Sequence, residues 1–497
     1  MKKERLSVEE RAFFRMVYHA AFANPFSELR ERLDLRIAGH FPGLDRGATA
    51  DRYILEINRR IEHLDREGRG HLDAFRGQDR TIIKTVFLFD VFYKYRERFD
   101  LLIKEQIRSG DESVPVPFAD QAMEMIRKRG IPEQEILHYF ALSYQLRRAF
   151  FFISHSLVGN SQCMKTLRRN LWNNVFTNDI GLYDRYLWNR MEDFSTLILG
   201  ETGTGKGTAA MAVGRSGYIP FDPGKKRFSV SFTRAFSSLN LSQFPETLLE
   251  SELFGHRKGA FTGAVDDYQG VFDRCSPHGS ILLDEIGEVS DHVQIKLLQV
   301  LQERSFTPVG SHVRSRFQGR VIGATNRSVS AIHRGEVFRD DFYYRLCSDI
   351  IEVPPLRERI SQDSTELVDL LSFTVTRMTG TAPEELTSRV LRVINRELGS
   401  SYSWPGNVRE LEQCVRRVVL RRSYEGRKES TKEEMGSTLI KGIQTGALSV
   451  PELVSGYCFL LYQRHGTYEQ VAKQTGLDRR TVKKYIDAHK ANGDTLR

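Results

Sequence analysis

Paired cysteines and long apolar runs are both missing from this chain. Its five cysteines lie far apart without a CxxC pair, which argues against a disulfide framework and a zinc site. No stretch approaches 18 uncharged apolar residues, and charged side chains begin directly after the first methionine. We therefore expect no signal peptide and no membrane span, and we expect a cytoplasmic protein.

A strong excess of one charge sign is also missing. The chain has 73 Lys and Arg against 64 Asp and Glu, so its net charge is +9. This balance is compatible with a nucleic-acid partner and does not require one. The length of 497 residues is too great for a single core and indicates about three domains.

Residues 1–155 contain no phosphate loop, metal cluster or repeat. Their pattern predicts helices, beginning with a capping box formed by Ser7 and Glu10. The aromatic-rich stretches 81–95 and 138–152 favour core packing over a ligand pocket. The apolar strand and paired acidic residues that open a phosphoacceptor domain are absent, so we assign this region as a helical regulatory domain of unknown type.

The pattern changes after residue 157, where short apolar runs alternate with helical stretches. The runs at 196–199, 280–283, 320–324 and 349–353 predict a mainly parallel α/β sheet.

A glycine-rich loop follows the first of these runs and precedes an alanine-rich helix. Backbone N–H groups of such a loop surround phosphate oxygens, and Lys206 adds a charge for the β- and γ-phosphates. The sequence therefore predicts an ATP site. Gly207, directly after the lysine, offers Mg²⁺ no ligand, and the hydroxyl of Thr208 lies one residue further along the chain. Metal coordination must therefore depend on water and nearby carboxylates. The predicted nucleotide-binding residues are Gly200, Glu201, Thr202, Gly203, Thr204, Gly205, Lys206, Gly207 and Thr208.

Two carboxylates end the apolar run at 280–283. Asp284 can hold Mg²⁺ through water, and Glu285 can polarise the water that attacks the γ-phosphate. Paired with Lys206, this strand end favours catalysis over a solvated turn.

The sequence GAFTGA at residues 259–264 predicts an exposed loop with two glycine hinges. Between the hinges, Phe261 and Thr262 place an aromatic ring and a hydroxyl at the tip. A loop without a function would more naturally be polar throughout.

Together with the phosphate loop and WPGNVREL at residues 404–411, GAFTGA resembles the sigma-54-dependent transcription activators, the bacterial enhancer-binding AAA+ ATPases. The resemblance extends from about 157 to 412 and does not include residues 1–155. It implies a loop that grips sigma-54 and a hexameric ring. The predicted sigma-54 contacts are Gly259, Ala260, Phe261, Thr262, Gly263 and Ala264.

The same resemblance assigns roles around the nucleotide. Asn326 corresponds to the sensor of the γ-phosphate, and Asn240 to a residue that restrains the catalytic glutamate. Arg339 and Arg345 correspond to arginine fingers that reach a neighbouring subunit, and Arg409 to the second sensor on the lid.

The C-terminal end has the spacing of a helix-turn-helix. Thr467 and Gln470 predict a capping box for the first helix, Gly476 ends it, and Asp478 caps the second helix. Four basic side chains on that second helix suit DNA phosphates and guanine edges. They are Arg479, Arg480, Lys483 and Lys484.

These observations predict a multidomain chain. Its parts are a mostly helical N-terminal domain (1–155), an AAA+ α/β ATPase core (156–357), a helical lid (358–424), a linker (425–450) and a helix-turn-helix DNA-binding domain (451–497).

The expected function is a transcription activator that binds upstream double-stranded DNA and uses ATP and Mg²⁺ to remodel the sigma-54 RNA polymerase holoenzyme. A DNA-binding regulator with an inactive or merely switching ATPase is the alternative, supported by Gly207 and the irregular segment 214–244. A chaperone or helicase loader is a third reading, which GAFTGA disfavours. The sequence does not reveal the inducing signal or the promoter.

Overall fold

Two compact units make up the molecule, Met1–Ser423 and Tyr424–Arg497. The computed structural model describes residues 5–39, 46–381, 383–426, 439–440, 442–443 and 445–493. Part of the predicted linker at 425–450 lies outside these residues. Within the described stretches, no helix combines the length and the hydropathy needed to cross a membrane.

The N-terminal region is helical, as the sequence predicts. The Ser7 capping box is present, because Ser7 Oγ accepts the Glu10 N–H at 3.2 Å and Glu10 Oε2 accepts the Ser7 N–H at 2.8 Å. The elements are α1 (Val8–Phe22), α2 (Glu28–Ile37), α3 (Arg46–Arg66), η1 (Leu72–Ala74), α4 (Gly77–Lys94), α5 (Arg96–Ser109), α6 (Ala119–Lys128), α7 (Glu133–Ser156) and α8 (Gln162–Phe176).

The central sheet has five parallel strands in the order β4-β5-β8-β1-β9. Four of them coincide with the predicted apolar runs, while β4 was not predicted. Strands buried on both faces have continuous apolar runs, and β1 is buried at every position. The strands are β1 (Thr196–Leu199), β4 (Phe236–Asn240), β5 (Ser280–Asp284), β8 (Arg320–Thr325) and β9 (Asp349–Glu352).

Helices cover both faces of this sheet, with short turns and two small hairpins between them. The first hairpin joins β2 (Phe221–Asp222) to β3 (Arg227–Phe228), and the second joins β6 (Ser305–Phe306) to β7 (Ser315–Arg316). The helices and turns are α9 (Ile180–Leu182), η2 (Tyr183–Leu187), η3 (Met191–Asp193), α10 (Lys206–Gly214), η4 (Leu241–Gln243), α11 (Glu246–Phe254), α12 (Val271–Arg274), η5 (Ile286–Glu288), α13 (Asp291–Glu303), α14 (Val329–His333) and α15 (Asp340–Leu346).

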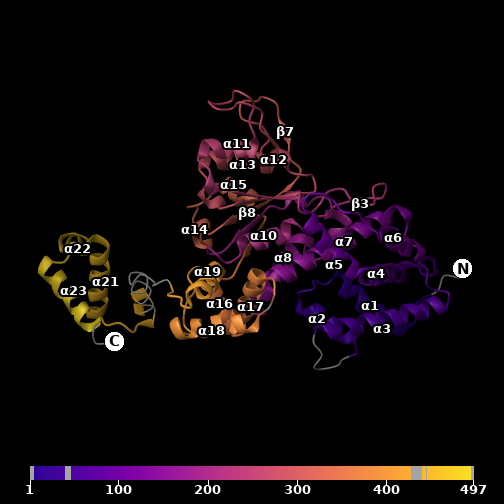
Figure 1. The fold of residues 1–497 in the computed structure, drawn as a ribbon, viewed down its shortest axis with the longest axis horizontal. Helices are drawn as coiled ribbons and strands as arrows, with labels where there is room; N and C mark the ends of the chain where they lie inside the picture. The colour runs from indigo at the N-terminus through magenta and orange to yellow at the C-terminus, as the bar shows by residue number, and fades with distance from the viewer. Residues whose placement is uncertain are drawn as a thin grey trace. The chain divides into compact units, whose positions relative to one another are not determined.

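Alternate side chains of each strand enter two different hydrophobic cores. Leu197 and Val321 face a core shared with α11, α12, α13 and α15. Ile198 and Ile322 face a core that continues through α10, α8 and α7 into the outer N-terminal helices. Figure 1 shows α8 and α7 between α10 and those outer helices. The N-terminal helices and the sheet therefore share one core, without a break at residue 155.

The irregular segment after α10 attaches to the N-terminal helices. Phe228 of β3 stacks on Tyr144 of α7 with ring centroids 4.1 Å apart. The Ser113 hydroxyl donates a hydrogen bond of 2.7 Å to the Phe228 carbonyl. This segment departs from the expected pattern because its apolar side chains contact the N-terminal region.

Four helices follow β9 and form the predicted lid. They are α16 (Leu356–Gln362), α17 (Glu366–Thr379), α18 (Glu384–Glu397) and α19 (Asn407–Arg421). The second unit contains α21 (Val450–His465), α22 (Tyr468–Thr475) and α23 (Arg479–Gly493), packed around Cys458, Val471 and Ile486.

Candidate functional site

The phosphate loop joins the end of β1 to the start of α10. Gly203 and Gly205 have φ angles of 82° and 105°, a region in which most side chains are strained. Lys206 folds back over the loop, because its Nζ donates to the Gly200 carbonyl at 2.9 Å and to the Glu201 carbonyl at 3.2 Å. The loop is thus preorganised around a lysine that is paired only with neutral carbonyl groups.

Burial lowers the pKa of Lys206, and the carboxylates of Glu285 and Asp284 oppose this shift. Asp284 ends β5 and Glu285 follows it, and β5 is separated from β1 by β8 alone. The carboxyl ends of parallel strands meet at one edge of a sheet, so the sheet brings the predicted lysine and carboxylates together.

The lid is attached to the phosphate loop through Glu201. Arg357 donates two hydrogen bonds to the Glu201 carboxylate, at 2.8 and 2.5 Å, and Asn407 Nδ2 donates a third at 3.1 Å. These bonds, mainly those from Arg357, hold the pKa of Glu201 below its usual range. A Cβ on Gly203 would lie 2.3 Å from the Gly406 carbonyl, so only glycine fits here.

Asn407 and Arg357 join the phosphate loop to the lid, and sequence reasoning missed both residues. Asn407 is fully buried, with a φ angle of 53° that is uncommon for a residue other than glycine. Its side chain also donates to the Thr202 carbonyl at 3.1 Å and accepts the Leu356 N–H at 2.8 Å. The only available signal was the match to WPGNVREL, which draws attention to Arg409 instead.

Glu285 combines an uncommon backbone conformation with a buried carboxylate oxygen that lacks a described hydrogen bond. Its backbone is left-handed, with a φ angle of 57°, and its Oε2 is buried without a hydrogen bond from any described residue. It lines a pocket of about 570 Å³ together with Asn326 and Glu288. An unpaired carboxylate oxygen in such a pocket can accept a hydrogen bond from water.

Asn326 follows β8 and lies beside the phosphate loop. Its Nδ2 donates to Thr202 Oγ1 at 3.3 Å. Asn240 ends β4 in register with Asp284, but its Oδ1 accepts the N–H and hydroxyl of Ser242. Its proposed restraint of Glu285 stays a prediction.

The position after the phosphate-loop lysine has room for a side chain. Gly207 is exposed, and a Cβ there would meet nothing within 4 Å. No group of three or more His, Cys, Asp or Glu in the described chain could hold a metal ion. Mg²⁺ in nucleotide sites is bound by one or two carboxylates, phosphates and water, which Asp284 fits.

The structure also places the three arginines that the sequence predicted to act on the nucleotide. Arg409 lies in the first turn of α19, and its N–H donates to the Gly203 carbonyl at 3.3 Å. Arg339 pairs with Asp341 at 3.0 Å beside α15, and Arg345 is exposed in the last turn of that helix. Neither Arg339 nor Arg345 bonds the phosphate loop among the described contacts.

The GAFTGA loop projects from the domain near β7 and α11 (Figure 1). The Gly259 N–H donates to the Ala264 carbonyl at 2.8 Å, which closes the loop. Gly259 and Gly263 have φ angles of 79° and 103° and open space around them. Phe261 and Thr262 are exposed between the two hinges.

Two sets of contacts hold the base of this loop. The backbone N–H groups of His256 and Tyr268 each donate to the other residue's carbonyl at 2.9 Å. The His256 ring packs against the Phe261 ring with centroids 4.9 Å apart. The β6–β7 hairpin supports the other side, where a Cβ on Gly310 would meet the Ala260 Cβ at 2.7 Å. The base of the loop is therefore held on both sides, and the exposed tip lies beyond these contacts.

In the second unit, a short turn joins α22 to α23. Gly476, with a φ angle of 70°, ends α22, and Asp478 accepts the Arg480 N–H at 2.7 Å as α23 begins. The predicted capping box at Thr467 is not formed, because the Thr467 hydroxyl donates to Gln470 Oε1 instead. The four predicted basic side chains of α23 are exposed: Arg479, Arg480, Lys483 and Lys484.

The parallel sheet, phosphate loop, acidic strand end and helical lid define an AAA+-like nucleotide-binding domain. Residues 185–352 match the family described as the sigma-54 interaction domain. This match, which covers about a third of the chain, agrees with the predicted resemblance to the sigma-54-dependent activators.

Relatives share this part of the chain. The Nif-specific regulatory protein of Azotobacter vinelandii is 44% identical over 234 residues, 47% of this chain and 40% of that protein. The formate hydrogenlyase transcriptional activator of Salmonella typhimurium is 41% identical over 232 residues, 46% of this chain and 30% of that protein. The chain thus spans less than half the length of these relatives. NtrX from Brucella abortus, solved in complex with ATP, aligns with 75% of this chain and 80% of its own at 20% identity, with a TM-score of 0.40.

Proposed function

We propose that this protein activates transcription by coupling ATP hydrolysis to movement of the GAFTGA loop against sigma-54 in RNA polymerase. The observation that carries this proposal is the exposed, hinged loop on a domain that also contains a phosphate loop and an acidic strand end. The match of residues 185–352 to the sigma-54 interaction domain family supports the choice of target.

The site residues support a division of labour. Lys206 binds the β- and γ-phosphates, and Asp284 holds Mg²⁺, which neutralises phosphate charge when bound. Glu285 accepts a proton from the attacking water through its unpaired oxygen. Asn326 beside β8 bonds Thr202 of the phosphate loop, and Glu201 of the loop bonds Arg357 and Asn407, so a change in the nucleotide alters both strand β8 and the lid.

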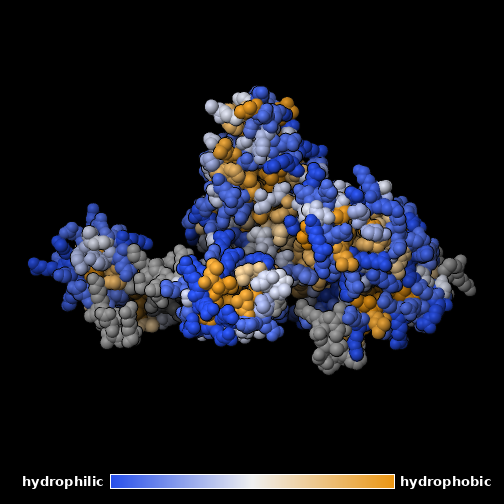
Figure 2. All heavy atoms as spheres, in the orientation of Figure 1, coloured by the Kyte–Doolittle hydropathy of each residue, from blue (hydrophilic) through white to orange (hydrophobic). Residues whose placement is uncertain are grey.

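The active form in this proposal is a homo-oligomer, hexameric by family resemblance. Exposed Arg345 and surface-paired Arg339 can reach the nucleotide of a neighbouring subunit. Figure 2 shows apolar surface over the lid, whose exposed side chains include Phe373 and Leu420. Exposed apolar groups of this kind favour burial against another subunit.

The C-terminal unit serves as the DNA-binding part in this proposal. A short turn between two helices and an exposed basic face on the second helix suit the major groove. Upstream double-stranded DNA would thereby concentrate the ATPase near the polymerase.

A second candidate is a DNA-binding regulator whose ATPase is inactive or only switches assembly. Gly207 favours it, because the position after the lysine lacks any side-chain oxygen for Mg²⁺.

Replacement of Thr262 by alanine tests the activator proposal. Thr262 carries no charge for ATP chemistry and lies at the loop tip, so T262A should hydrolyse ATP within a few fold of the wild-type rate. It should also abolish open-complex formation at a sigma-54 promoter, because the moving loop loses its contact. Phosphate release and permanganate footprinting measure the two effects.

Thr381→Ala, an exposed threonine on the lid, is the matched control and should retain both activities. Normal open-complex formation by T262A would remove the central support for the activator and favour the second candidate.

A further inference from the structure

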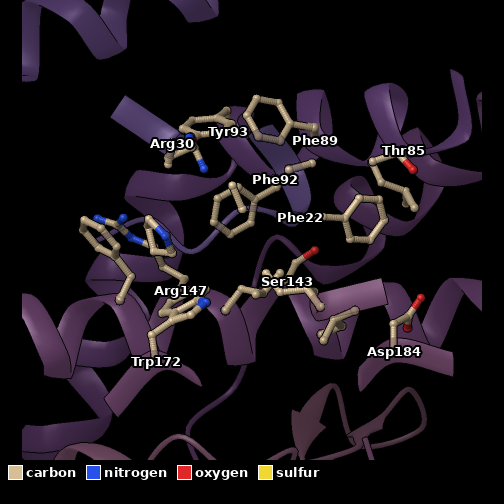
Figure 3. Close-up of a pocket in the computed structure, with 18 of the residues that line it drawn as sticks. Phe22, Arg30, Thr85, Phe89, Phe92, Tyr93, Ser143, Arg147, Trp172 and Asp184 are labelled. Atoms are coloured by element: carbon tan, nitrogen blue, oxygen red, sulfur yellow. The ribbon is translucent and has the colours of Figure 1, made fainter. Parts of the chain in front are cut away.

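A large cavity lies among the N-terminal helices, away from the phosphate loop. Its volume is about 1460 Å³, and side chains from α1, α4, α7 and α8 line it. Figure 3 shows aromatic rings gathered around this space. They include Phe22, Phe26, Phe89, Phe92, Phe150 and Trp172. Sequence reasoning assigned two of these aromatic stretches to core packing, whereas several of their rings border open space.

Several charged groups around the cavity are paired with one another. Arg30 donates to Asp34 at 2.7 Å and to the Tyr93 hydroxyl at 2.9 Å. Arg147 donates two bonds of 2.6 Å to Asp100.

Two further pairs complete this set. Lys84 bonds Glu135, and His138 Nε2 lies 2.6 Å from the Asp184 carboxylate. These four pairs are internally neutralised, so they offer an ionic ligand no free charge, and burial of an unpaired charge is costly.

Two buried nitrogens of the cavity lining have no hydrogen-bond partner among the described residues, His138 Nδ1 and the indole nitrogen of Trp172. Trp172 is 4% exposed, and its indole Nε1 is buried without a hydrogen bond from any described residue. Figure 3 shows the Trp172 nitrogen turned toward the middle of the cavity. Buried indole N–H groups usually find an acceptor, so this group indicates where a ligand oxygen or nitrogen would lie.

We propose that this cavity binds an uncharged aromatic small molecule whose hydrogen-bond acceptor meets the Trp172 indole. Flat rings gain from offset or edge contacts with the aromatic lining. A volume of this size suits a drug-sized ligand or a larger one. The proposal does not depend on the function of the GAFTGA loop.

The helices that line this cavity also contact the strand and the helix on either side of the phosphate loop. Gln145 of α7 donates to the Ser216 carbonyl at 3.0 Å, just beyond α10. Asn174 of α8 donates to Thr196 Oγ1 at 2.9 Å, at the start of β1. A ligand in the cavity therefore contacts helices whose opposite faces support the phosphate-loop strand and helix.

Three naphthalenes test the chemistry by binding to the full-length protein. 2-Acetylnaphthalene supplies rings and an acceptor, 2-ethylnaphthalene lacks the acceptor, and 2-naphthoate carries a charge. We expect 2-acetylnaphthalene to bind most tightly and 2-naphthoate at least about tenfold more weakly, because the charge has no partner. Fluorescence titration and calorimetry measure the affinities. Equal or tighter binding of 2-naphthoate would overturn the proposal, as would no saturable binding of 2-acetylnaphthalene.

Trp172→Phe keeps a ring and removes the donor. It should weaken 2-acetylnaphthalene by about threefold to tenfold, the contribution of one hydrogen bond, and leave 2-ethylnaphthalene unchanged. Equal effects on the two ligands would refute the assigned hydrogen bond.

Ser143→Phe locates the site independently. Ser143 points into the cavity from α7, and its hydroxyl bonds only the Tyr139 carbonyl of its own helix. The added ring should reduce 2-acetylnaphthalene binding at least about tenfold by filling the space. Leu137→Phe on the exposed face of the same helix is the control. Unchanged binding by S143F, with ATP binding retained as the folding check, would place the ligand elsewhere and contradict the proposal.

Discussion

The ATP site and the aromatic cavity share supporting helices but recognise ligands by different physics. The proposed ATP site combines a glycine-rich loop, one lysine and two carboxylates that follow the ends of parallel strands. The cavity is lined by aromatic rings, mostly from the N-terminal helices, and by the buried Trp172 indole N–H. Phosphate recognition constrains the backbone and so leaves a local motif, whereas an apolar cavity requires only shape. One site was therefore visible in sequence and the other was not.

Their charges differ in the same way. Lys206 bonds only to neutral carbonyl groups, and Glu285 has an unpaired oxygen, so the ATP site is prepared for a charged ligand. Around the cavity, Arg30 and Arg147 are committed to neighbouring carboxylates. Charge pairing thus separates the two classes of ligand.

The largest expected effects come from the two central groups of the ATP site. Lys206→Ala should lower ATP affinity at least about 100-fold, because a buried charge contact to phosphate is lost. Glu285→Ala should retain ATP binding and reduce hydrolysis at least about 100-fold, because the water loses its base. Calorimetry and phosphate release separate these effects.

Neither substitution should change binding of 2-acetylnaphthalene by more than about twofold, if the sites recognise ligands independently. A similar loss of ATP affinity in both variants would reject the separate roles of clamp and base.

A smaller effect is expected from filling the open position after the lysine. Gly207→Thr supplies a hydroxyl and should lower the Mg²⁺ concentration for half-maximal hydrolysis by about fivefold. Gly207→Ala is the matched control, since it restores about 1 kcal/mol of helix propensity without an oxygen. Titration of Mg²⁺ against phosphate release distinguishes them. Identical Mg²⁺ dependence in both variants would show that the position does not reach the metal.

The smallest effect is expected at the C-terminal helix, whose charges are exposed and screened. Lys483→Ala or Arg479→Ala should weaken DNA binding by several fold and reduce the salt slope by about 1. Arg479 already pairs with Glu469 at 2.9 Å, so Lys483 should matter more. Fluorescence anisotropy across a salt series measures this, with exposed Lys473→Ala on α22 as control. Unchanged affinity at every salt concentration would exclude a DNA role for this face.

Sequence patterns located most of the sheet and the motif residues of the ATP site. Continuous apolar runs predicted β1, β5, β8 and β9, because parallel strands covered on both faces must be apolar. The edge strand β4 was missed, since its sequence FSSLN contains two serines and no buried position. Edge strands need fewer apolar side chains, so their pattern is weak.

Contacts between distant segments could not be predicted in the same way. The pairing of Glu201 with Arg357 and Asn407 joins residues more than 150 positions apart. Asn407 adopts a left-handed backbone that its sequence alone does not require. Only the packing of α19 against the phosphate loop brings these groups together.

By itself, the sequence determined the phosphate loop, the acidic strand end, the hinged GAFTGA loop and the helical periodicities. These features are local, because backbone geometry and side-chain spacing act over a few residues. The tertiary structure alone decided that the N-terminal helices share a core with the sheet, that the segment after α10 attaches to them, and that their aromatic rings enclose a cavity. Those outcomes depend on how apolar faces from segments far apart in the sequence pack together. The spacing of residues within one segment does not determine that packing.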